Sequence, residues 1–310
     1  MIESLLTLLG SLVFDYTVRN VALGSAVLGV AGGVLGTFAV LRRQGLLGDA
    51  LAHATLPGVC VAFILAGTRA PVVLLAGAAV SAALGALVIS AIVGSTRVKY
   101  DAALGIVLSV FFGAGAVLIT YIAGSGDAAQ SGLDRFIFGQ ASTIVAGDVL
   151  TTGALALAAL AVVAVFFKEF KLLSFDPEFA AGLGLPVRRL DLLLTSLVVV
   201  AVIIGIQAVG VVLMAAMLIT PAAAARQWTD RLGSMAFISG SFGAVSGVAG
   251  ALLSASGEGL PTGPLVVLCA TAILIFSLTF GRRRGIFWSR LRSRRNRREA
   301  LGAAGIGEAR

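Results

Sequence analysis

The sequence predicts an all-α, polytopic membrane protein with about eight to nine transmembrane helices. Of its 310 residues 58% are apolar and only 12% are charged, and the mean hydropathy is +1.03. Several apolar runs reach the roughly 20 residues that a helix needs to cross a bilayer. A transmembrane β-barrel would instead show alternating segments of about ten residues. The 39 glycines suit close approach between helices in lipid.

The apolar segments can be placed in order along the chain. Residues 1–20 are expected to form a short interfacial or re-entrant helix, because this apolar run is short and contains two acidic residues. The stretch 191–225 is too long for one straight span, and Gly205 and Gln207 near its middle predict two short helices with a tight reversal. Single spans are expected at 21–41, 47–67, 71–94, 102–123, 148–167, 233–254 and 262–280.

Basic residues mark the connections expected in the cytoplasm. They cluster at 42–43, 97–99, 168–189, 226–231 and 282–284. An alternating path through nine spans places all of these clusters on one side, as the positive-inside rule requires. The connection 124–147, expected to hold a partly buried loop or a short lid helix, then lies outside. The domain organisation is therefore a transmembrane domain at 21–281, followed by a basic, disordered cytoplasmic tail at 282–310.

The basic tail does not indicate nucleic-acid binding. Arginines interleaved with aromatic residues are typical of a segment that rests on anionic lipid, and no nucleic-acid-binding module accompanies them. The expected surroundings of the chain are the lipid bilayer and protein partners.

The second predicted span carries a carboxylate and the only histidine of the chain. Asp49 and His53 are four residues apart, so a helix places both side chains on one face. Pro57 has no N–H to offer the carbonyl of His53, which leaves that oxygen without its helical partner. These ligand types suit zinc, manganese or iron better than Cu(I). Because ionisable groups inside a membrane usually line a pathway, we predict a metal site at Asp49 and His53.

A structural role for the same pair is the alternative. Asp49 could favour the positive end of the helix dipole, and His53 could be a buried, packed imidazole. Cys60 lies on the same helix face but is expected to pack in the core, as are Met214 and Met217. Acidic residues near the predicted outer entrance could attract cations or simply be solvated; these are Asp127, Asp134 and Glu258.

Three stretches carry a family resemblance that covers most of residues 20–280. They are LGDALAHATLPG at 47–58, FDPEFAAGLGLP at 175–186, and the segment 205–227 with its VGVVLM and TPAAAAR motifs. In this order they resemble the signature, the ATPase-engaging segment and a late membrane motif of the permeases of manganese, zinc and iron ABC importers. The resemblance implies a type II ABC importer-like permease, most often a homodimer, in the bacterial cytoplasmic membrane.

The resemblance also implies a division of labour between subunits. The chain has no phosphate-binding G-x-x-x-x-G-K-[ST] sequence, so ATP hydrolysis would come from cytoplasmic ATPase partners and the chain itself is not expected to be an enzyme. An extracellular solute-binding protein would deliver the metal, which is the cargo; no permanently bound cofactor is expected. The polar segment 168–190 would couple to the ATPase through 174–186, in particular through Asp176 as N-cap, Pro177, Glu178, Gly182 and Gly184.

Manganese is the favoured cargo, with zinc and ferrous iron as alternatives. A single histidine and candidate ligands with oxygen donors favour manganese, and the sequence at 175–186 resembles the manganese branch of the family. The intrinsic affinity of such a site would nevertheless be higher for zinc than for manganese. The alternative function is an ion- or proton-coupled secondary transporter that works without an ATPase. Such carriers often show internal repeats around broken helices, and no convincing repeat is present. A membrane scaffold would leave Asp49 and His53 unexplained.

Overall fold

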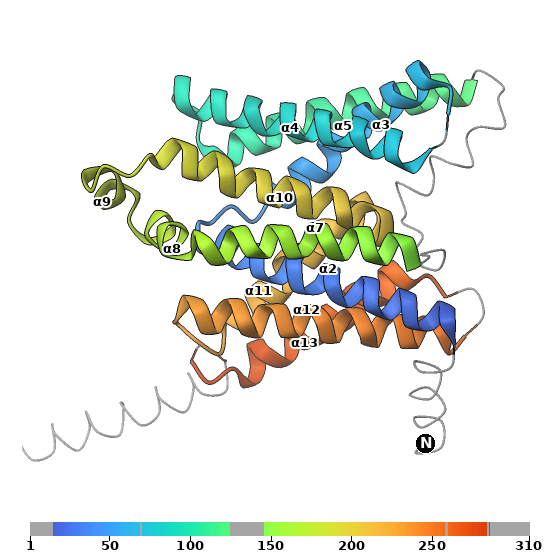
Figure 1. Cartoon of the computed structure of the whole chain (residues 1–310). Helices are drawn as coiled ribbons and strands as arrows, with labels where there is room; N and C mark the ends of the chain where they lie inside the picture. Colours follow the sequence, from blue (N-terminus) through green and yellow to red (C-terminus); the bar gives the residue numbers. More distant parts are fainter. Residues whose placement is uncertain (1–14, 69, 125–145, 258–259, 284, 286–310) are drawn as a thin grey trace, which may run out of the picture.

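The computed structural model describes residues 15–68, 70–124, 146–257, 260–283 and 285 (Figure 1). Within these ranges the chain forms eleven α-helices and no strand, which confirms the all-α prediction. In chain order they are α2 (Tyr16–Leu41), α3 (Leu47–Ala66), α4 (Pro71–Ser95), α5 (Tyr100–Gly124), α7 (Ala146–Val165), α8 (Phe167–Phe175), α9 (Pro177–Gly182), α10 (Val187–Val209), α11 (Val211–Arg226), α12 (Leu232–Ala255) and α13 (Thr262–Phe280).

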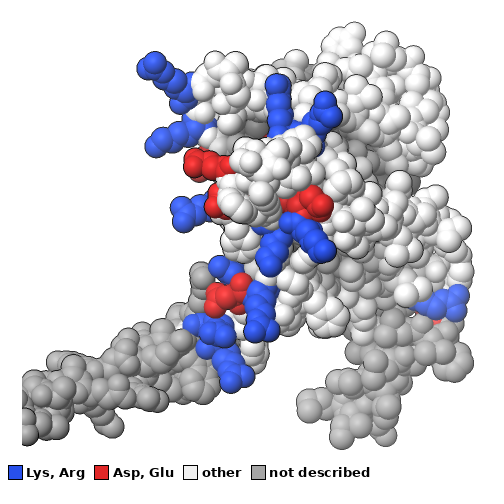
Figure 2. Space-filling model, turned by 60° about the vertical axis from the view of Figure 1, so that its left-hand side comes forward, with Lys and Arg blue, Asp and Glu red and all other residues white. Residues whose placement is uncertain are grey.

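Eight of the described helices are long and apolar enough to cross a membrane, and α11 is a shorter apolar helix. The predicted number of eight to nine spans is therefore confirmed. In Figure 1 the long helices lie side by side, with α4 and α5 at one edge of the bundle and α12 and α13 at the other. The short helices α8 and α9 project at one end. Figure 2 turns this end toward the viewer and shows that lysine and arginine side chains gather on it.

The first spanning helix begins earlier than expected. Asp15 is its N-cap, and the carboxylate accepts hydrogen bonds from the backbone N–H groups of Thr17 at 2.8 Å and Val18 at 3.2 Å. This cap satisfies donors that the first helical turn otherwise leaves open. Residues 16–20, predicted to lie in an interfacial helix, therefore belong to α2. The rest of that predicted helix lies outside the described residues, as do residues 125–145 and most of the predicted tail.

The reversal predicted near Gly205 and Gln207 occurs at Gly210. This residue has φ 86° and ψ 166°, a conformation open to glycine because it lacks a Cβ. Gly205 instead stays within α10, where the side chain of Met214 fills the space next to it. The prediction of two short helices was therefore half right: α10 is a full span, and only α11 is short.

The segment after α7 is more helical than expected. We predicted a polar stretch with a helical part near Pro177, whereas the structure adds α8 before it. Phe170 and Leu173 lie three residues apart on α8 and are both buried, and the ring of Phe170 packs edge-on against Phe38 of α2 at 5.9 Å. A one-sided apolar pair at helical spacing thus anchors α8 to the bundle.

Helices α2 and α12 pack backbone to backbone. A Cβ added to Gly33 would lie 2.5 Å from the carbonyl oxygen of Ser239, and Gly29 meets the backbone of Gly243 one turn away. The hydroxyl of Ser239 donates a hydrogen bond to the carbonyl oxygen of Gly33 at 2.6 Å. Small residues at four-residue spacing permit this approach, which is the usual way for helices to associate in lipid.

Candidate metal centre and coupling segment

The turn before α3 sets the position of the candidate metal ligands. Arg43 has φ 57°, a left-handed conformation that reverses the chain directly after α2, and the N–H of Gln44 returns to the carbonyl of Ala39 at 2.8 Å. The guanidinium of Arg42 pairs with the carboxylate of Asp191 on α10. This tight turn and ion pair fix the start of α3, and in Figure 1 that start lies further inside the bundle than the adjacent ends of α4 and α10.

Asp49 and His53 lie on one face of α3, as predicted. The Nε2 atom of His53 is 3.4 Å from Oδ1 of Asp49, and the two side chains are 16% and 31% exposed, respectively. Within the described residues, the Nδ1 atom of the imidazole is buried and has no hydrogen-bond partner. The ring packs edge-on against Phe112 of α5, with centroids 5.0 Å apart. The side chains of this site therefore offer an imidazole nitrogen that has no partner among the described residues and, beside it, a partly exposed carboxylate.

The helix continues through Pro57, which lies inside α3. Proline cannot donate to the carbonyl of His53, so this oxygen is a third group with unused hydrogen-bonding capacity near the pair. Pro57 also packs against Gly115 of α5, where an added Cβ would lie 3.4 Å from the proline ring. The same proline thus frees a carbonyl and brings α5 close to α3.

The described residues contain no group of three or more His, Cys, Asp or Glu side chains that could hold a metal ion. The pair therefore offers two side-chain donors from one chain. A tetrahedral or octahedral ion would need further ligands from water, from backbone carbonyls or from another chain. Such a partial site can bind an ion weakly enough to release it.

Only some of the further candidate residues lie in the described part of the structure. Cys60 is buried with Val59 and Leu74 in a small apolar cluster, and Met214 and Met217 are buried in the main core, so their predicted packing roles are confirmed. Asp127, Asp134, Glu258 and the side chain of Gln207 lie outside the described part of the structure.

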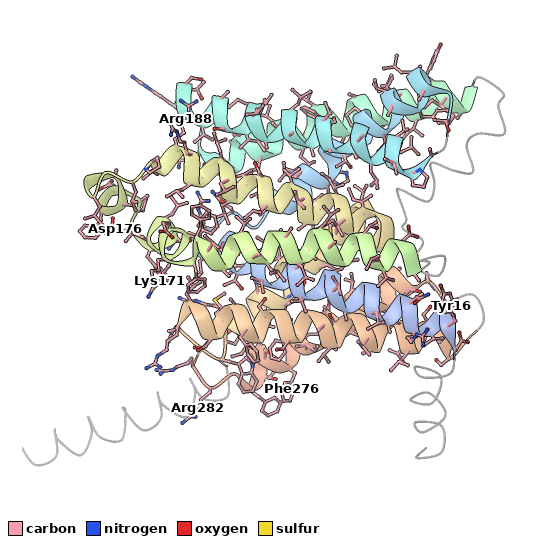
Figure 3. All side chains as sticks on the ribbon, in the orientation of Figure 1. Tyr16, Lys171, Asp176, Arg188, Phe276 and Arg282 are labelled. Atoms are coloured by element: carbon pink, nitrogen blue, oxygen red, sulfur yellow. The ribbon has the colours of Figure 1, made fainter. Side chains whose placement is uncertain are left out.

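The predicted coupling segment forms a compact projection of helices α8 and α9. Oδ1 of Asp176 accepts a hydrogen bond from the N–H of Phe179 at 2.9 Å, which makes Asp176 the N-cap of α9, and Pro177 occupies the first helical position. These two features follow the sequence prediction. Figure 3 shows Asp176 at the tip of the projection and Lys171 and Arg188 near its base.

The remaining predicted residues of this segment end the short helix or lie on its surface. Glu178 is exposed in the first turn of α9, Gly182 is its last residue, and Gly184 turns the chain with φ 80°. Two large apolar side chains are exposed beside them, Phe179 at 57% and Leu183 at 60%. Apolar groups on a charged end of the molecule suit contact with another protein.

Sequence reasoning missed the ion pair between Arg42 and Asp191. The two residues are 149 positions apart, and each looks like an ordinary charge at the end of an apolar span. The only available signal is that α10 follows α9 almost directly, so a charge in its first turns must lie near the projection. The pair connects the base of α3 to α10, the helix that follows the predicted coupling segment.

Comparisons with known proteins give consistent matches. A family model described as "ABC 3 transport family" matches residues 14–281. The manganese transport system membrane protein MntC of Bacillus subtilis is 51% identical over 275 residues, which cover 89% of this chain and 63% of the relative. The chain thus spans less than two thirds of the length of that protein. The zinc transport system membrane protein TroC of Treponema pallidum is 47% identical over 281 residues, which cover 91% of this chain and 94% of the relative.

Solved structures share the architecture. The structure described as PsaBC from Streptococcus pneumoniae in complex with Fab superposes with a TM-score of 0.78 at 32% identity and covers 92% of this chain and 98% of that one. An inward-facing structure described as a putative metal-chelate type ABC transporter gives a TM-score of 0.65 at 17% identity, which shows the shared fold alone; it covers 87% and 88% of the two chains.

Proposed function

The chain belongs to the ABC 3 transport family, and from this membership we propose that it is the permease subunit of an ATP-driven importer for divalent manganese. The eight apolar spans among its described residues and its bacterial relatives, which are membrane proteins of transport systems, make it a multi-pass protein of the bacterial cytoplasmic membrane. The observation that carries the proposal is the pair of Asp49 and His53 on the start of α3, inside an otherwise apolar bundle.

Manganese fits the donor chemistry of this site. One carboxylate, one imidazole and a spare carbonyl form an oxygen-rich set, whereas tight zinc sites in proteins usually have more nitrogen or sulfur donors. The relative with 51% identity is named for manganese, and the one with 47% is named for zinc. Because zinc binds most such sites more tightly than manganese, transport competition rather than affinity must separate the two metals.

A second copy of the chain would complete the ligand set. Two donors leave most positions of a six-coordinate ion open, and a twofold axis near the pair would double both the carboxylate and the imidazole. Helices α4 and α5 leave surface for such a copy, since 33% and 22% of their apolar stretches are buried within one chain, the same low level as the 22% of α7 and of α13. We therefore infer a homodimer with the metal path at its centre.

Coupling to ATP hydrolysis would pass through the projecting helices. The exposed Phe179 and Leu183 provide an apolar surface for a cytoplasmic ATPase, and the Asp176 cap keeps α9 folded. Movement of α9 would shift α10, and the ion pair of Asp191 with Arg42 would transmit the shift to the base of α3. Access to Asp49 and His53 would thereby alternate between the outer and the inner side. An extracellular solute-binding protein would supply the ion.

The family model describes ABC transport proteins, which favours this importer over a self-powered carrier. The deciding measurement is uptake of radioactive manganese into proteoliposomes that hold the permease with its ATPase and solute-binding protein. Asp49→Asn and His53→Gln should each reduce uptake by at least about tenfold, in line with the loss of a metal ligand or its support. Zinc in excess should compete for the wild-type protein.

The control for this measurement is Asp101→Asn, which removes an exposed carboxylate at the start of α5. This variant should transport normally, and all three variants should co-purify with the ATPase. Normal uptake by both Asp49→Asn and His53→Gln would refute the site. Manganese uptake that does not require the ATPase would refute the proposal of an ATP-driven importer.

A further inference from the structure

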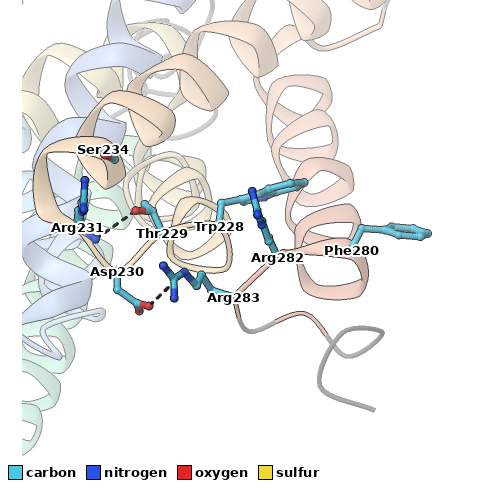
Figure 4. A pocket seen from close by; sticks show the side chains of 8 residues that line it. All are labelled: Trp228, Thr229, Asp230, Arg231, Ser234, Phe280, Arg282 and Arg283. Atoms are coloured by element: carbon cyan, nitrogen blue, oxygen red, sulfur yellow. Dashed lines mark hydrogen bonds and ion pairs between the residues drawn. The ribbon is translucent and has the colours of Figure 1, made fainter. Parts of the chain in front are cut away.

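Polar groups at the cytoplasmic end of the bundle are engaged with one another. Figure 4 shows the turn between α11 and α12 beside the end of α13, where a carboxylate oxygen of Asp230 lies 3.9 Å from the guanidinium of Arg283. In the same turn the backbone N–H of Arg231 donates to the hydroxyl of Thr229 at 3.2 Å. Ser109, in the middle of α5, differs from these groups because it is exposed and its hydroxyl has no hydrogen bond among the described residues.

The hydroxyl of Ser109 lies on an open face of α5. Gly105 and Gly113 are four residues before and after it, and an added Cβ at either glycine would meet nothing within 4 Å. Thr120, nearer the other end of the helix, turns its hydroxyl back to the carbonyl oxygen of Ala116 at 2.9 Å. Ser109 makes no such bond within the described chain, so its oxygen keeps its full capacity to bind a ligand. The face around it has room for a hydrated ion.

Ser109 lies at the same depth in the membrane as Asp49. Helices α3 and α5 run in the same direction, because each begins after a basic, cytoplasmic connection. They pack against one another, and the ring of Phe112 contacts that of His53 with centroids 5.0 Å apart. Ser109 is three residues before Phe112, and Asp49 is four residues before His53. One helical turn back from the aromatic contact therefore brings both side chains to one level.

The two side chains also lie on the same side of the contact between α3 and α5. Helix α4 covers the other side, where an added Cβ at Gly85 would lie 2.9 Å from Ala54 of α3 and 4.0 Å from Phe111 of α5. Asp49 is about 140° around α3 from Ala54, given the residues per turn of an α-helix. Ser109 is about 160° around α5 from Phe111 by the same measure. Both positions therefore face away from α4, in agreement with the exposure of the two side chains.

We propose that Ser109 is a further oxygen donor of the metal path, whose hydroxyl contacts the hydrated cation while the ion is held at Asp49. This inference rests on the proposed import function and adds one residue to its path. One carboxylate and one imidazole leave most positions of the ion open, and neutral oxygen ligands suit manganese better than softer metals. A hydroxyl carries no charge, so it can replace water on the ion without holding it too tightly to be released.

The first test measures manganese uptake by proteoliposomes that hold the permease with its ATPase and solute-binding protein. Ser109→Ala removes the hydroxyl and should lower uptake by about tenfold, as for the loss of a group that supports a metal ligand. Ser109→Thr keeps a hydroxyl and should retain most of the uptake. Ser241→Ala is the matched control, because this exposed serine of α12 donates only within its own helix, to Phe237. It should transport normally.

The second test uses a thiol to report the position of the side chain. Ser109→Cys places a soft donor beside the carboxylate and the imidazole, a set that favours Cd²⁺ over manganese. Proteoliposomes are incubated with Cd²⁺ and washed before manganese is added with the solute-binding protein. Uptake by this variant should be blocked at a Cd²⁺ concentration at least about tenfold lower than for the wild type, and a chelator should reverse the block. The wild type contains two cysteines and provides the baseline.

Ser241→Cys is the control for the thiol, because α12 lies at the other edge of the bundle from α5 (Figure 1). It should respond to Cd²⁺ as the wild type does. Normal uptake by Ser109→Ala would overturn the proposal, since the hydroxyl would then not serve the ion. A loss in Ser109→Ala without a Cd²⁺ block in Ser109→Cys would assign the residue to helix packing and would overturn it as well.

These outcomes are distinct from those that test the proposed function. Asp49→Asn and His53→Gln should lose uptake whether or not Ser109 contributes. If those two variants lose uptake while Ser109→Ala does not, the metal site stands and only the role of Ser109 is refuted.

Discussion

Helix α2 differs from helices α4 and α5 in how apolar residues are used, while α3 and α12 lie between them, each with 44% of its apolar stretch buried. In α2, 72% of the apolar stretch is buried inside the chain, whereas in α5 only 22% is. Helix α2 meets α12 along its backbone at Gly29 and Gly33, while many large side chains of α4 and α5 point outward. Hydropathy runs the other way, from 1.8 in the apolar stretch of α2 to 2.5 in that of α4 and 2.4 in that of α5, so hydropathy alone does not decide which helices form the core.

The difference suggests a division between a rigid part and a part that contacts its surroundings. Backbone contacts between α2 and α12 leave little room for sliding. Gly58 of α3 and Gly77 of α4 make a contact of the same kind, but α4 and α5 expose most of their surface to lipid or to a second copy. Asp49 and His53 lie on α3, at the border of the two parts. Matched substitutions in the two regions can test this division.

The largest expected difference concerns two phenylalanines. Phe38 is fully buried against Phe167 and Phe170, so Phe38→Ala should cost about 3 kcal/mol of stability through the cavity it leaves. Phe112 is 47% exposed, so Phe112→Ala should cost less than about 1 kcal/mol. Thermal unfolding of both purified variants in detergent measures the difference. Equal losses would contradict the division.

Glycine substitutions should give the next largest effect. Gly33→Ala forces a methyl group against the backbone of α12 and should cost about 2 kcal/mol by overpacking. Gly113→Ala on α5 meets nothing within 4 Å and should be neutral or slightly stabilising, because alanine favours helix. Melting temperatures in detergent compare the two. A loss of stability in Gly113→Ala but not in Gly33→Ala would mean that α5, and not α2, lies in the core.

The ion pair at the base of α3 should affect transport more than stability. Arg42→Gln and Asp191→Asn each break the link between α10 and the turn before α3. We expect each variant to take up manganese about fivefold more slowly while ATP hydrolysis is retained. The double variant should take up manganese no more slowly than either single variant, because the two residues act together. Parallel uptake and hydrolysis assays measure this. Additive losses in the double variant would argue against a shared role.

The smallest expected effect isolates one hydrogen bond between helices. Ser239→Ala removes the bond to the carbonyl of Gly33 and should cost about 0.6 kcal/mol, the average for such bonds in membrane proteins. Ser241→Ala is the control, because its hydroxyl donates only within α12, to Phe237. Chemical unfolding of the two variants gives the comparison. A cost above that of Gly33→Ala would mean that the hydrogen bond, not the close backbone approach, holds the pair.

Much of the fold was predictable because spanning helices follow from length and hydropathy alone. The Asp176 cap, Pro177 and the shared face of Asp49 and His53 were predictable for a similar reason, since each depends on local spacing. The features that sequence reasoning missed depend on distant contacts. The ion pair of Arg42 with Asp191 needs two helices in register. The reversal falls at Gly210, which has φ 86°, whereas Gly205 stays helical and packs against Met214.

The exposed apolar tip of α9 has a consequence for how the cell maintains this protein. Phe179 and Leu183 are accessible to water when no other subunit covers them, and such surfaces are what chaperones and proteases recognise. If the proposed ATPase covers this tip, a permease synthesised in excess of it would present this signal on every copy, whereas an assembled one would hide it. Subunit stoichiometry would then be set by selective degradation of orphan copies, without any need for matched rates of synthesis.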